Sequence, residues 1–318
     1  MRRGLLLLII SSVFFLPGGC DAPSRPLRVG TNVWPGYEPL YLARERGYLP
    51  ESAVRLSELT SASDVMDALR LRHLEAGALT LDEALSLLAE GEDLVIVLVF
   101  DISAGADIIV ARNSIESLPQ LAGKTIALET NAVGALMLQS ALNMAGLSPD
   151  QVTIRHMPPA DHTRAFRAHR IDAAVTFEPY ASELLRAGAH TLFDSRAIPG
   201  QIVDVLVVQR SALDEHRQQI STLIRAYFRA QEEIRQQPDK ALPILNQRLK
   251  LSAENIPHMF DGLELPDQAA NHRLLSGSPS PLERSAQQLA VLMKQQHLLS
   301  QSLTVNDITR PDFTGAEN

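Results

Sequence analysis

A regular alternation of short apolar segments with amphipathic segments constrains the fold of this chain most strongly. Residues 27–32, 76–80 and 173–176 have the length and composition of β-strands, and each is followed by a segment with helical periodicity. An unbroken apolar run at 94–100 is typical of a strand that is covered on both faces. The alternation predicts an α/β protein with a mostly parallel sheet and helices on its faces.

The remaining elements follow from the same periodicities. We expect strands at 27–32, 54–60, 76–80, 94–100, 107–112, 124–129, 152–156, 173–176, 191–193 and 202–209. We expect helices at 39–47, from 63 onward, 81–91, 132–145, 163–169 and 179–188, followed by a region of helices only, at 213–236, 241–249, 253–260 and 282–299. From residue 311 onward we expect a loose tail.

Size and charge narrow the class of protein. A chain of 318 residues with 45% hydrophobic and 21% charged residues can form two folded lobes with full cores. The formal net charge of −8, without any basic run, argues against a nucleic-acid partner. No phosphate-cradling loop, dinucleotide fingerprint or hydrolase elbow is present, and the nine scattered histidines fit no metal pattern, so we expect no cofactor, no metal and no catalytic residues.

The N-terminus has the pattern of a targeting segment. Arg2 and Arg3 precede an apolar run at 5–16, which is short for a membrane span and fits the core of a secretory signal. A single membrane anchor is the alternative interpretation. Residues 1–20 are therefore interpreted as a signal peptide and residues 21–26, with two prolines, as a linker.

Cys20 is the only cysteine and follows two glycines, so no disulfide framework is possible. The sequence LPGGC resembles a bacterial lipoprotein signal, in which the cysteine becomes the lipidated first residue. Pro17 departs from that pattern, and Asp21 is typical of retention at the inner membrane. The resemblance implies a soluble domain tethered through Cys20, on the periplasmic side of the inner membrane or at the cell surface. A free cysteine beside an ordinary cleavage site is the alternative.

Loops that follow the predicted strands are the places to look for a ligand site. In an open α/β sheet, ligands bind outside the carboxyl ends of the strands. Informative loops occupy such positions at 32–37, 80–83, 100–107, 129–133 and 176–180. Their common placement indicates a single site assembled from several loops.

Four sequence stretches occur in the order of a known family. They are TNVWPGYEPLYLA, FDISAGADIIVAR, LPQLAGKTIALET and IDAAVTFEPY. Together they resemble the periplasmic solute-binding proteins of the nitrate, sulfonate and taurine class of ABC importers, a group that also includes binding proteins for thiamin pyrimidine precursors. The resemblance covers residues 27–209 well and the helical C-terminal third only in general character.

The resemblance implies the two-lobed periplasmic binding protein fold (type II), with two crossover strands. Lobe 1 would comprise residues 27–105 and 205–310, lobe 2 residues 106–204, and the tail residues 311–318. It further implies a monomer that closes on a small-molecule solute and docks on an ABC permease in the inner membrane.

Aromatic side chains in these loops are the first candidates for ligand contact. Trp34 and Tyr37 would line the cleft from lobe 1, and Phe177 and Tyr180 from lobe 2, because flat rings on opposite walls can hold a small solute and exclude water. The alternative for Trp34 is a packing role as a lid on the first helix.

Polar candidates come from the same loops. Glu178 matches the acidic position of the family's aromatic-Glu-Pro motif and is the leading candidate, although a carboxylate at the start of a helix is favourable in any case. The others are Asp82, Asp101, Ser103, Asp107, Thr130 and Asn131. For Asp82, favourable helix N-terminal electrostatics is the better account; Ser103 and Asp107 can instead fix the hinge turn, and Thr130 and Asn131 can be plain N-caps.

These residues leave the charge of the solute open. The carboxylates favour an amine, a guanidine-like group or a ring rich in N–H groups, whereas helix N-termini favour a sulfonate or nitrate. No arginine or lysine lies at any of the five loop tips. A periplasmic enzyme on the same fold, resembling a pyrimidine synthase or a chorismate dehydratase, and a ligand-sensing module for a membrane partner are the alternative functions. The absence of cysteine after Cys20 counts against the first enzyme, and the leader against the second.

Overall fold

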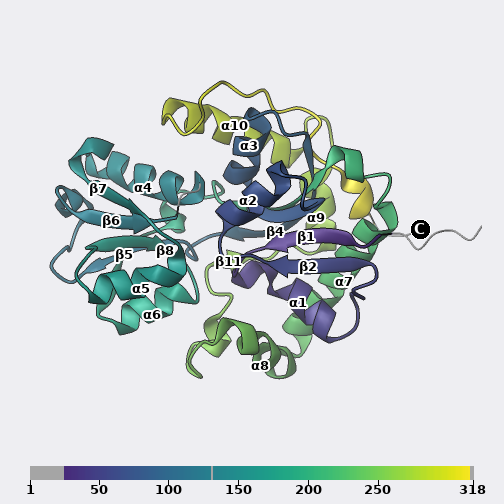
Figure 1. The fold of residues 1–318 in the computed structure, drawn as a ribbon, viewed down its shortest axis with the longest axis horizontal. Helices are drawn as coiled ribbons and strands as arrows, with labels where there is room; N and C mark the ends of the chain where they lie inside the picture. Colours follow the sequence, from purple (N-terminus) through teal and green to yellow (C-terminus); the bar gives the residue numbers. More distant parts are fainter. Residues whose placement is uncertain (1–24, 130–131, 316–318) are drawn as a thin grey trace, which may run out of the picture.

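The computed structural model describes residues 25–129 and 132–315, which form two mixed β-sheets with covering helices (Figure 1). The larger sheet has the strand order β11-β4-β10-β3-β1-β2. Its strands are β1 (Leu27–Thr31), β2 (Val54–Glu58), β3 (Ala76–Thr80), β4 (Leu94–Ser103), β10 (Val203–Gln209) and β11 (Leu263–Glu264). The smaller sheet has the order β7-β6-β8-β5-β9. Its strands are β5 (Ile108–Arg112), β6 (Thr125–Leu128), β7 (Thr153–His156), β8 (Ala173–Thr176) and β9 (Ala189–Asp194).

The helices divide between the two sheets (Figure 1). With the smaller sheet, in the left half of the view, lie α4 (Ala132–Ala145), α5 (Pro159–Arg167) and α6 (Tyr180–Arg186). With the larger sheet lie α1 (Glu38–Glu45), α2 (Ala62–Arg70), α3 (Leu81–Ala89), α7 (Arg217–Gln236), α8 (Pro238–Leu249), α9 (Gln268–Leu275) and α10 (Pro281–Gln295). The α/β class predicted from the sequence is confirmed.

The apolar run that forms β4 separates two hydrophobic cores. Side chains alternate along a strand, so Leu94 and Ile96 join the core on one face, while Val95 and Val97 join the core on the other. The two cores leave no solvated face at this strand, which explains why the run contains no alternating polar residues. Its expected burial on both faces is confirmed.

Strand direction departs from the expected mostly parallel arrangement. β1 is parallel to both β2 and β3, but β10 is antiparallel to β3 and β4. The smaller sheet is mixed in the same way, with β5 antiparallel to its two neighbours. The reason is the path of the chain: it leaves the larger sheet along β4, builds the smaller sheet, and returns along β10 in the opposite direction.

The helical C-terminal third differs from the prediction at two places. Residues 253–260 form turns and a short 3-10 segment, Ile256–His258, because Pro257 cannot donate the hydrogen bond that an α-helix needs. The sequence analysis missed α9, whose N-cap Asp267 accepts a hydrogen bond from the Ala270 N–H at 2.7 Å. Asn271 on α9 is buried and bonds the N–H and carbonyl of Val99, which fixes this helix against β4.

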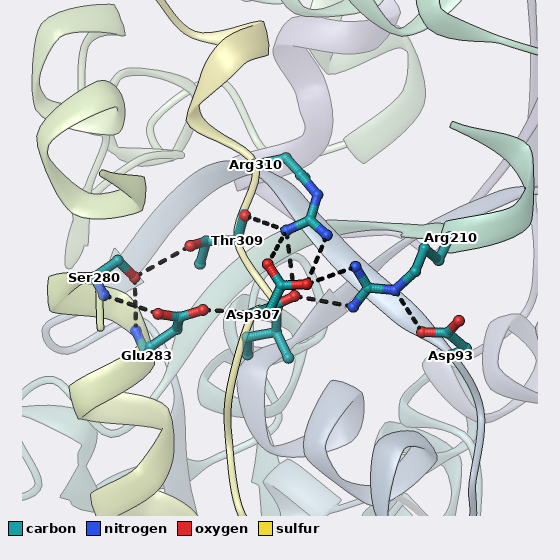
Figure 2. A network of polar contacts seen from close by, with 8 residues as sticks. Asp93, Arg210, Ser280, Glu283, Asp307, Thr309 and Arg310 are labelled. Atoms are coloured by element: carbon teal, nitrogen blue, oxygen red, sulfur yellow. Dashed lines mark hydrogen bonds and ion pairs between the residues drawn. The ribbon is translucent and has the colours of Figure 1, made fainter. Parts of the chain in front are cut away.

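The end of the described chain is packed, and the expected loose tail is wrong for residues 311–315. The Ile96 N–H donates to the Ile308 carbonyl at 2.6 Å, and the Arg310 N–H donates to the Ile96 carbonyl at 2.9 Å. Phe313 and Thr314 are buried. Figure 2 shows how Arg210 joins Asp93 to Asp307 beside this segment. Backbone pairing with β4 and burial of an aromatic ring replace the solvated tail that the polar composition indicated.

Some predictions fall on residues outside the described part of the chain. They are the signal peptide, the lipidation site Cys20, and the candidates Thr130 and Asn131. In the described residues, no helix combines the length and apolarity needed to cross a membrane.

Candidate ligand-binding site

A small, partly open cavity lies where the two sheets meet. It has a volume of about 20 Å³, which is room for about one water molecule. Its walls come from both sheets: Asn32 and Trp34 follow β1, Asp107 precedes β5, and Phe177 follows β8. The full lining is Asn32, Trp34, Tyr37, Ala62, Thr80, Glu83, Asp107, Glu129, Val133, Phe177 and Asp204. Loops at strand ends thus assemble one site, at the edge that the sequence indicated.

Aromatic rings from the two sides meet at this cavity. Trp34 and Phe177 pack edge to face, with ring centroids 5.2 Å apart and planes at 83°. Tyr37 packs against Phe100 of β4 at 5.0 Å. The contact between Trp34 and Phe177 joins the loop after β1 to the loop after β8, so the indole closes the cavity across the boundary between the sheets.

In the stretch WPGY, the tryptophan and the tyrosine each donate a hydrogen bond to a buried carboxylate. The Trp34 Nε1–H donates to Asp101 Oδ2 at 3.0 Å, and the Tyr37 hydroxyl donates to Asp204 Oδ1. A side chain at position 36 would collide with Asp101, because a Cβ there would lie 1.7 Å from Oδ2. Gly36 therefore permits the close approach that places the indole and the phenol on their carboxylates.

Asp101 and Asp204 are a buried pair of carboxylates. They stand directly opposite each other on the antiparallel strands β4 and β10. Both are nearly inaccessible to solvent. Burial raises the pKa of Asp101 to about 7, while the bond from Trp34 acts in the opposite direction. Burial and the neighbouring charge of Asp101 hold the pKa of Asp204 well above its usual range. Both shifts favour the protonated form of these acids.

A second pair of carboxylates stands at the start of α3. Glu83 forms a capping box with Thr80, whose N–H donates to Glu83 Oε2 at 2.9 Å. Burial raises the pKa of Asp82 to about 6. Burial, together with the charges of Asp82 and Glu129, raises the pKa of Glu83 well above its ordinary value. The cap accounts for one oxygen of Glu83 and leaves the other facing the cavity without a partner.

Asp107 and Glu129 complete the acidic lining from the side of the smaller sheet. Burial raises the pKa of Asp107 to about 7, and its Oδ2 atom has no hydrogen-bond partner. Glu129 is better satisfied, because Oε1 accepts from the Ser63 N–H at 3.0 Å and from the Ser63 hydroxyl at 3.1 Å. That bond also ties the loop after β6 to α2, across the boundary between the sheets.

The predicted site residues divide into two groups. Trp34, Tyr37, Asp107 and Phe177 line the cavity, and Asp101 supports Trp34 from behind. Outside the lining lie Asp82, Ser103, Glu178 and Tyr180. Ser103 bonds Ser195 at 2.8 Å and accepts from the Asp107 N–H at 3.2 Å, as the alternative hinge-turn interpretation expects.

Glu178, the leading polar candidate, precedes α6 and bonds the first turn of that helix. Its Oε1 atom accepts from the Ser182 hydroxyl at 2.7 Å, and its Oε2 atom accepts from the Ser182 N–H at 3.3 Å. Tyr180 is half-buried and packs against Phe177 with ring centroids 5.9 Å apart. Both residues hold the loop that presents Phe177 and contribute no surface to the cavity.

Several lining residues were not named as candidates from the sequence, although most of them lie in the loops that it singled out. They are Asn32, Ala62, Thr80, Glu83, Glu129, Val133 and Asp204. Glu129 stood at the end of a predicted strand, and Glu83 at the end of the loop 80–83. Asp204 carried the clearest signal, because it is a single carboxylate in the apolar stretch VDVLVV. Within the described residues, no group of three His, Cys, Asp or Glu is placed to hold a metal ion.

The sequence profile of the NMT1-like family matches residues 21–244, well over half of the chain. This protein belongs to the NMT1-like family. A curated relative of this NMT1-like protein is the putative aliphatic sulfonates-binding protein of Escherichia coli (strain K12). It is 26% identical over 264 residues, which cover 81% of this chain and 82% of the relative.

Solved structures of similar fold are also binding proteins. The alkanesulfonate-binding protein SsuA from Xanthomonas axonopodis pv. citri, bound to MOPS, has a TM-score of 0.75 at 19% identity, covering 89% of this chain and 97% of that one. The periplasmic nitrate-binding protein NrtA from Synechocystis PCC 6803 has a TM-score of 0.72 at 14% identity, covering 92% and 88%. These likenesses confirm the periplasmic binding protein fold. The family match and the curated relative bear out the resemblance stated from the sequence.

Proposed function

We propose that this NMT1-like protein is an extracytoplasmic solute-binding protein that delivers a small nitrogen- or sulfur-containing solute to an ABC importer. The observation that carries the proposal is the cavity between the sheets, whose aromatic and polar walls come from both of them. Small-molecule sites have this character, and they occur preferentially between domains. The family and the binding proteins of similar fold support the same function.

In this proposal the two sheets belong to lobes that open and close around the solute. Lobe 1 comprises residues 27–105 and 205–310, and lobe 2 residues 106–204. A cavity of about 20 Å³ is too small for an organic solute, so the lobes must separate to admit one. The segments that join β4 to β5 and β9 to β10 are the only covalent links at this boundary within the described residues, and they act as the hinge.

A thermal-shift screen of the purified protein tests the function. Candidate solutes are small amines, sulfonates, taurine, nitrate and pyrimidines. A solute present at about 100 times its dissociation constant stabilises the folded state by roughly 2.7 kcal/mol. Trp34→Ala should abolish that shift while the empty protein still unfolds cooperatively. Full affinity in the Trp34→Ala variant would show that the site is misplaced.

The same complex tests binding against catalysis. We propose a reversible complex with no turnover and no catalytic residue, and therefore a bound solute that is recovered chemically unchanged after prolonged incubation. Recovery of a product would favour an enzyme on this fold. Solute uptake that depends on both this protein and a permease would distinguish import from ligand sensing.

We further propose that the protein acts as a monomer tethered to the membrane by lipid on Cys20. The support is the LPGGC stretch alone. Cells grown with a labelled fatty acid should label the wild-type protein and not a Cys20→Ala variant. Equal labelling of both, or of neither, contradicts the anchor without affecting the proposed binding function.

A further inference from the structure

The chemistry of the cavity narrows the class of solute, provided that the proposed function holds. Four of the lining side chains are carboxylates, namely Glu83, Asp107, Glu129 and Asp204, and none is arginine or lysine. Asp82 and Asp101 stand behind them, buried and also acidic. Four carboxylates thus line the cavity and two more lie close to them, with no arginine or lysine among the described lining residues.

The hydrogen bonds made within the protein leave specific atoms unfilled. One oxygen each of Glu83, Asp107 and Asp204 has no partner, although these side chains are 1%, 5% and 2% exposed. Asn32 Oδ1 in the lining also lacks a partner. These atoms are acceptor oxygens, and a buried acceptor without a donor is costly. Among the described side chains of the lining, the carboxylate and amide oxygens therefore outnumber the donors that reach them.

An oxyanion would make this imbalance worse. Sulfonate and nitrate present only acceptor oxygens and a negative charge, which would face carboxylate oxygens in a buried space. A cation with several N–H groups supplies what is missing, because each N–H can fill one oxygen and the positive charge offsets the carboxylates. The rings of Trp34, Tyr37 and Phe177 line the same cavity, and aromatic rings attract cations through their faces.

We propose that the solute is a compact organic cation rich in N–H donors, such as an amine, amidine or guanidine, and that Glu83, Asp107 and Asp204 receive its N–H groups. The aliphatic or aromatic remainder of the solute would lie against the rings. Entry of the positive charge favours the ionised carboxylates, so binding releases protons from the cluster near neutral pH.

Calorimetry with matched ligands tests the proposal. Methylguanidine, acetamidine and ethylamine should bind the full-chain protein, whereas ethanesulfonate and nitrate should not. Titrations of the cations in two buffers of different ionisation enthalpy should give different apparent heats, which reports the release of protons. Glu83→Gln and Asp107→Asn should each weaken cation binding by about 10- to 100-fold, the effect expected for loss of a charged hydrogen bond.

A matched control separates this effect from general damage to the fold. Glu283 is also buried, but both of its oxygens are filled, by the Ser280 N–H at 2.8 Å and the Ile308 N–H at 2.9 Å. Glu283→Gln should lower the unfolding midpoint and leave cation affinity unchanged. Asp107→Asn should instead raise the midpoint of the empty protein at pH 8, because an amide there removes an unpaired buried charge and adds a donor.

The outcomes distinguish this inference from the proposed function. Tight binding of an oxyanion with no response to the cations would overturn the cationic solute and leave the function standing. Failure of both classes to bind, even at millimolar concentration, would remove both. A fall in the midpoint of empty Asp107→Asn equal to that of Glu283→Gln would also count against the inference, because it would show that the oxygens of Asp107 are filled within the protein.

Discussion

Two regions of this molecule bury carboxylates, and they differ in whether a cation lies beside the buried acid. Glu38 at the start of α1 is fully buried, and Arg248 from α8 lies beside it with Nε 3.2 Å from Glu38 Oε2. The guanidinium also stacks on Tyr41, with its carbon 3.3 Å from the ring centroid. The carboxylates at the cavity have aromatic neighbours too, but no lysine or arginine lines that site.

Arg248 also pairs with Glu58, so the buried acid of α1 has a cation beside it that joins elements of the fold. The described lining of the cavity has no such cation, and we propose that its acids serve a solute instead. Arg248 comes from a helix far along the chain and joins α8 to α1 through an ion pair. At the cavity, Trp34 and Tyr37 fill only part of the carboxylate oxygens. Buried oxygens without donors are costly in the empty protein, and the cationic solute proposed above would supply those donors.

The largest expected effect comes from removing the cation beside Glu38. Arg248→Met leaves Glu38 buried without a cation, which should cost about 3–5 kcal/mol in the free energy of unfolding at pH 8. Urea unfolding measures it, and the double variant Glu38→Gln with Arg248→Met should recover most of the loss. A loss below about 1 kcal/mol would mean that the two regions do not differ in the way described.

The next effect concerns the pH dependence of the carboxylates at the cavity. The pKa of Asp107 is raised to about 7 in the folded protein, above its value in the unfolded chain. The folded state therefore holds an extra proton between about pH 4 and 7, and this group lowers stability as pH rises through that window, by up to about 1.4 kcal/mol per pH unit. Asp107→Asn should gain stability over wild type progressively from pH 4.5 to pH 8.

Comparison of the two proteins is needed because other groups titrate in the same range. Glu38 has a pKa raised to about 7 by burial and gives a trend of the same sign. His162 gives the opposite trend, since burial lowers its pKa to about 4 and its neutral form is lost on acidification. Both contributions cancel in the difference between wild type and Asp107→Asn. A difference that stays constant with pH would contradict the raised pKa.

A smaller effect isolates one hydrogen bond in the cavity wall. Trp34→Phe keeps a ring against Phe177 but removes the N–H that donates to Asp101. The expected cost is about 1–3 kcal/mol of unfolding free energy, because a buried carboxylate oxygen loses its donor. Adding Asp101→Asn should reduce that cost in a double-mutant cycle. Independent, additive effects of the two changes would show that the bond contributes no coupling.

The smallest expected effect comes from an ion pair at the surface, which serves as a reference for the buried carboxylates of both regions. Arg210 pairs with Asp93 and Asp307 at the surface, as Figure 2 shows, and both carboxylates are more than half exposed. Arg210→Ala should cost at most about 1 kcal/mol, and the cost should shrink in high salt. A larger, salt-independent loss would assign the effect to anchoring of the C-terminal segment.

Much of the fold could be predicted from local patterns. The apolar run of β4 predicts a strand, and the capping box at Thr80 and Glu83 predicts the start of a helix. Each pattern occupies only a few residues. Errors occurred where long-range contacts decide the outcome: α9 depends on Asn271 bonding to β4, and the C-terminal segment depends on pairing with Ile96. Neither partner is visible from the local sequence.

The candidate site was predictable as a set of loops and only partly as a set of residues. Trp34 and Phe177 were found because each is a large ring in a loop that follows a predicted strand. Glu83 was not singled out within its loop and Asp204 stood in an apolar strand, whereas Glu178 was favoured on a motif and bonds Ser182.

The sequence by itself determined the α/β class, the positions of most strands and helices, and the gathering of loops at strand ends, because hydrophobic periodicity and capping act over a few residues. Only the tertiary structure decided which carboxylates meet. Asp101 and Asp204 lie 103 positions apart in the sequence and face each other on neighbouring strands. A buried carboxylate is paired with a cation only if the fold brings a distant arginine or lysine beside it. Arg248 lies beside Glu38 in this way, whereas no arginine or lysine is among the described lining residues of the cavity.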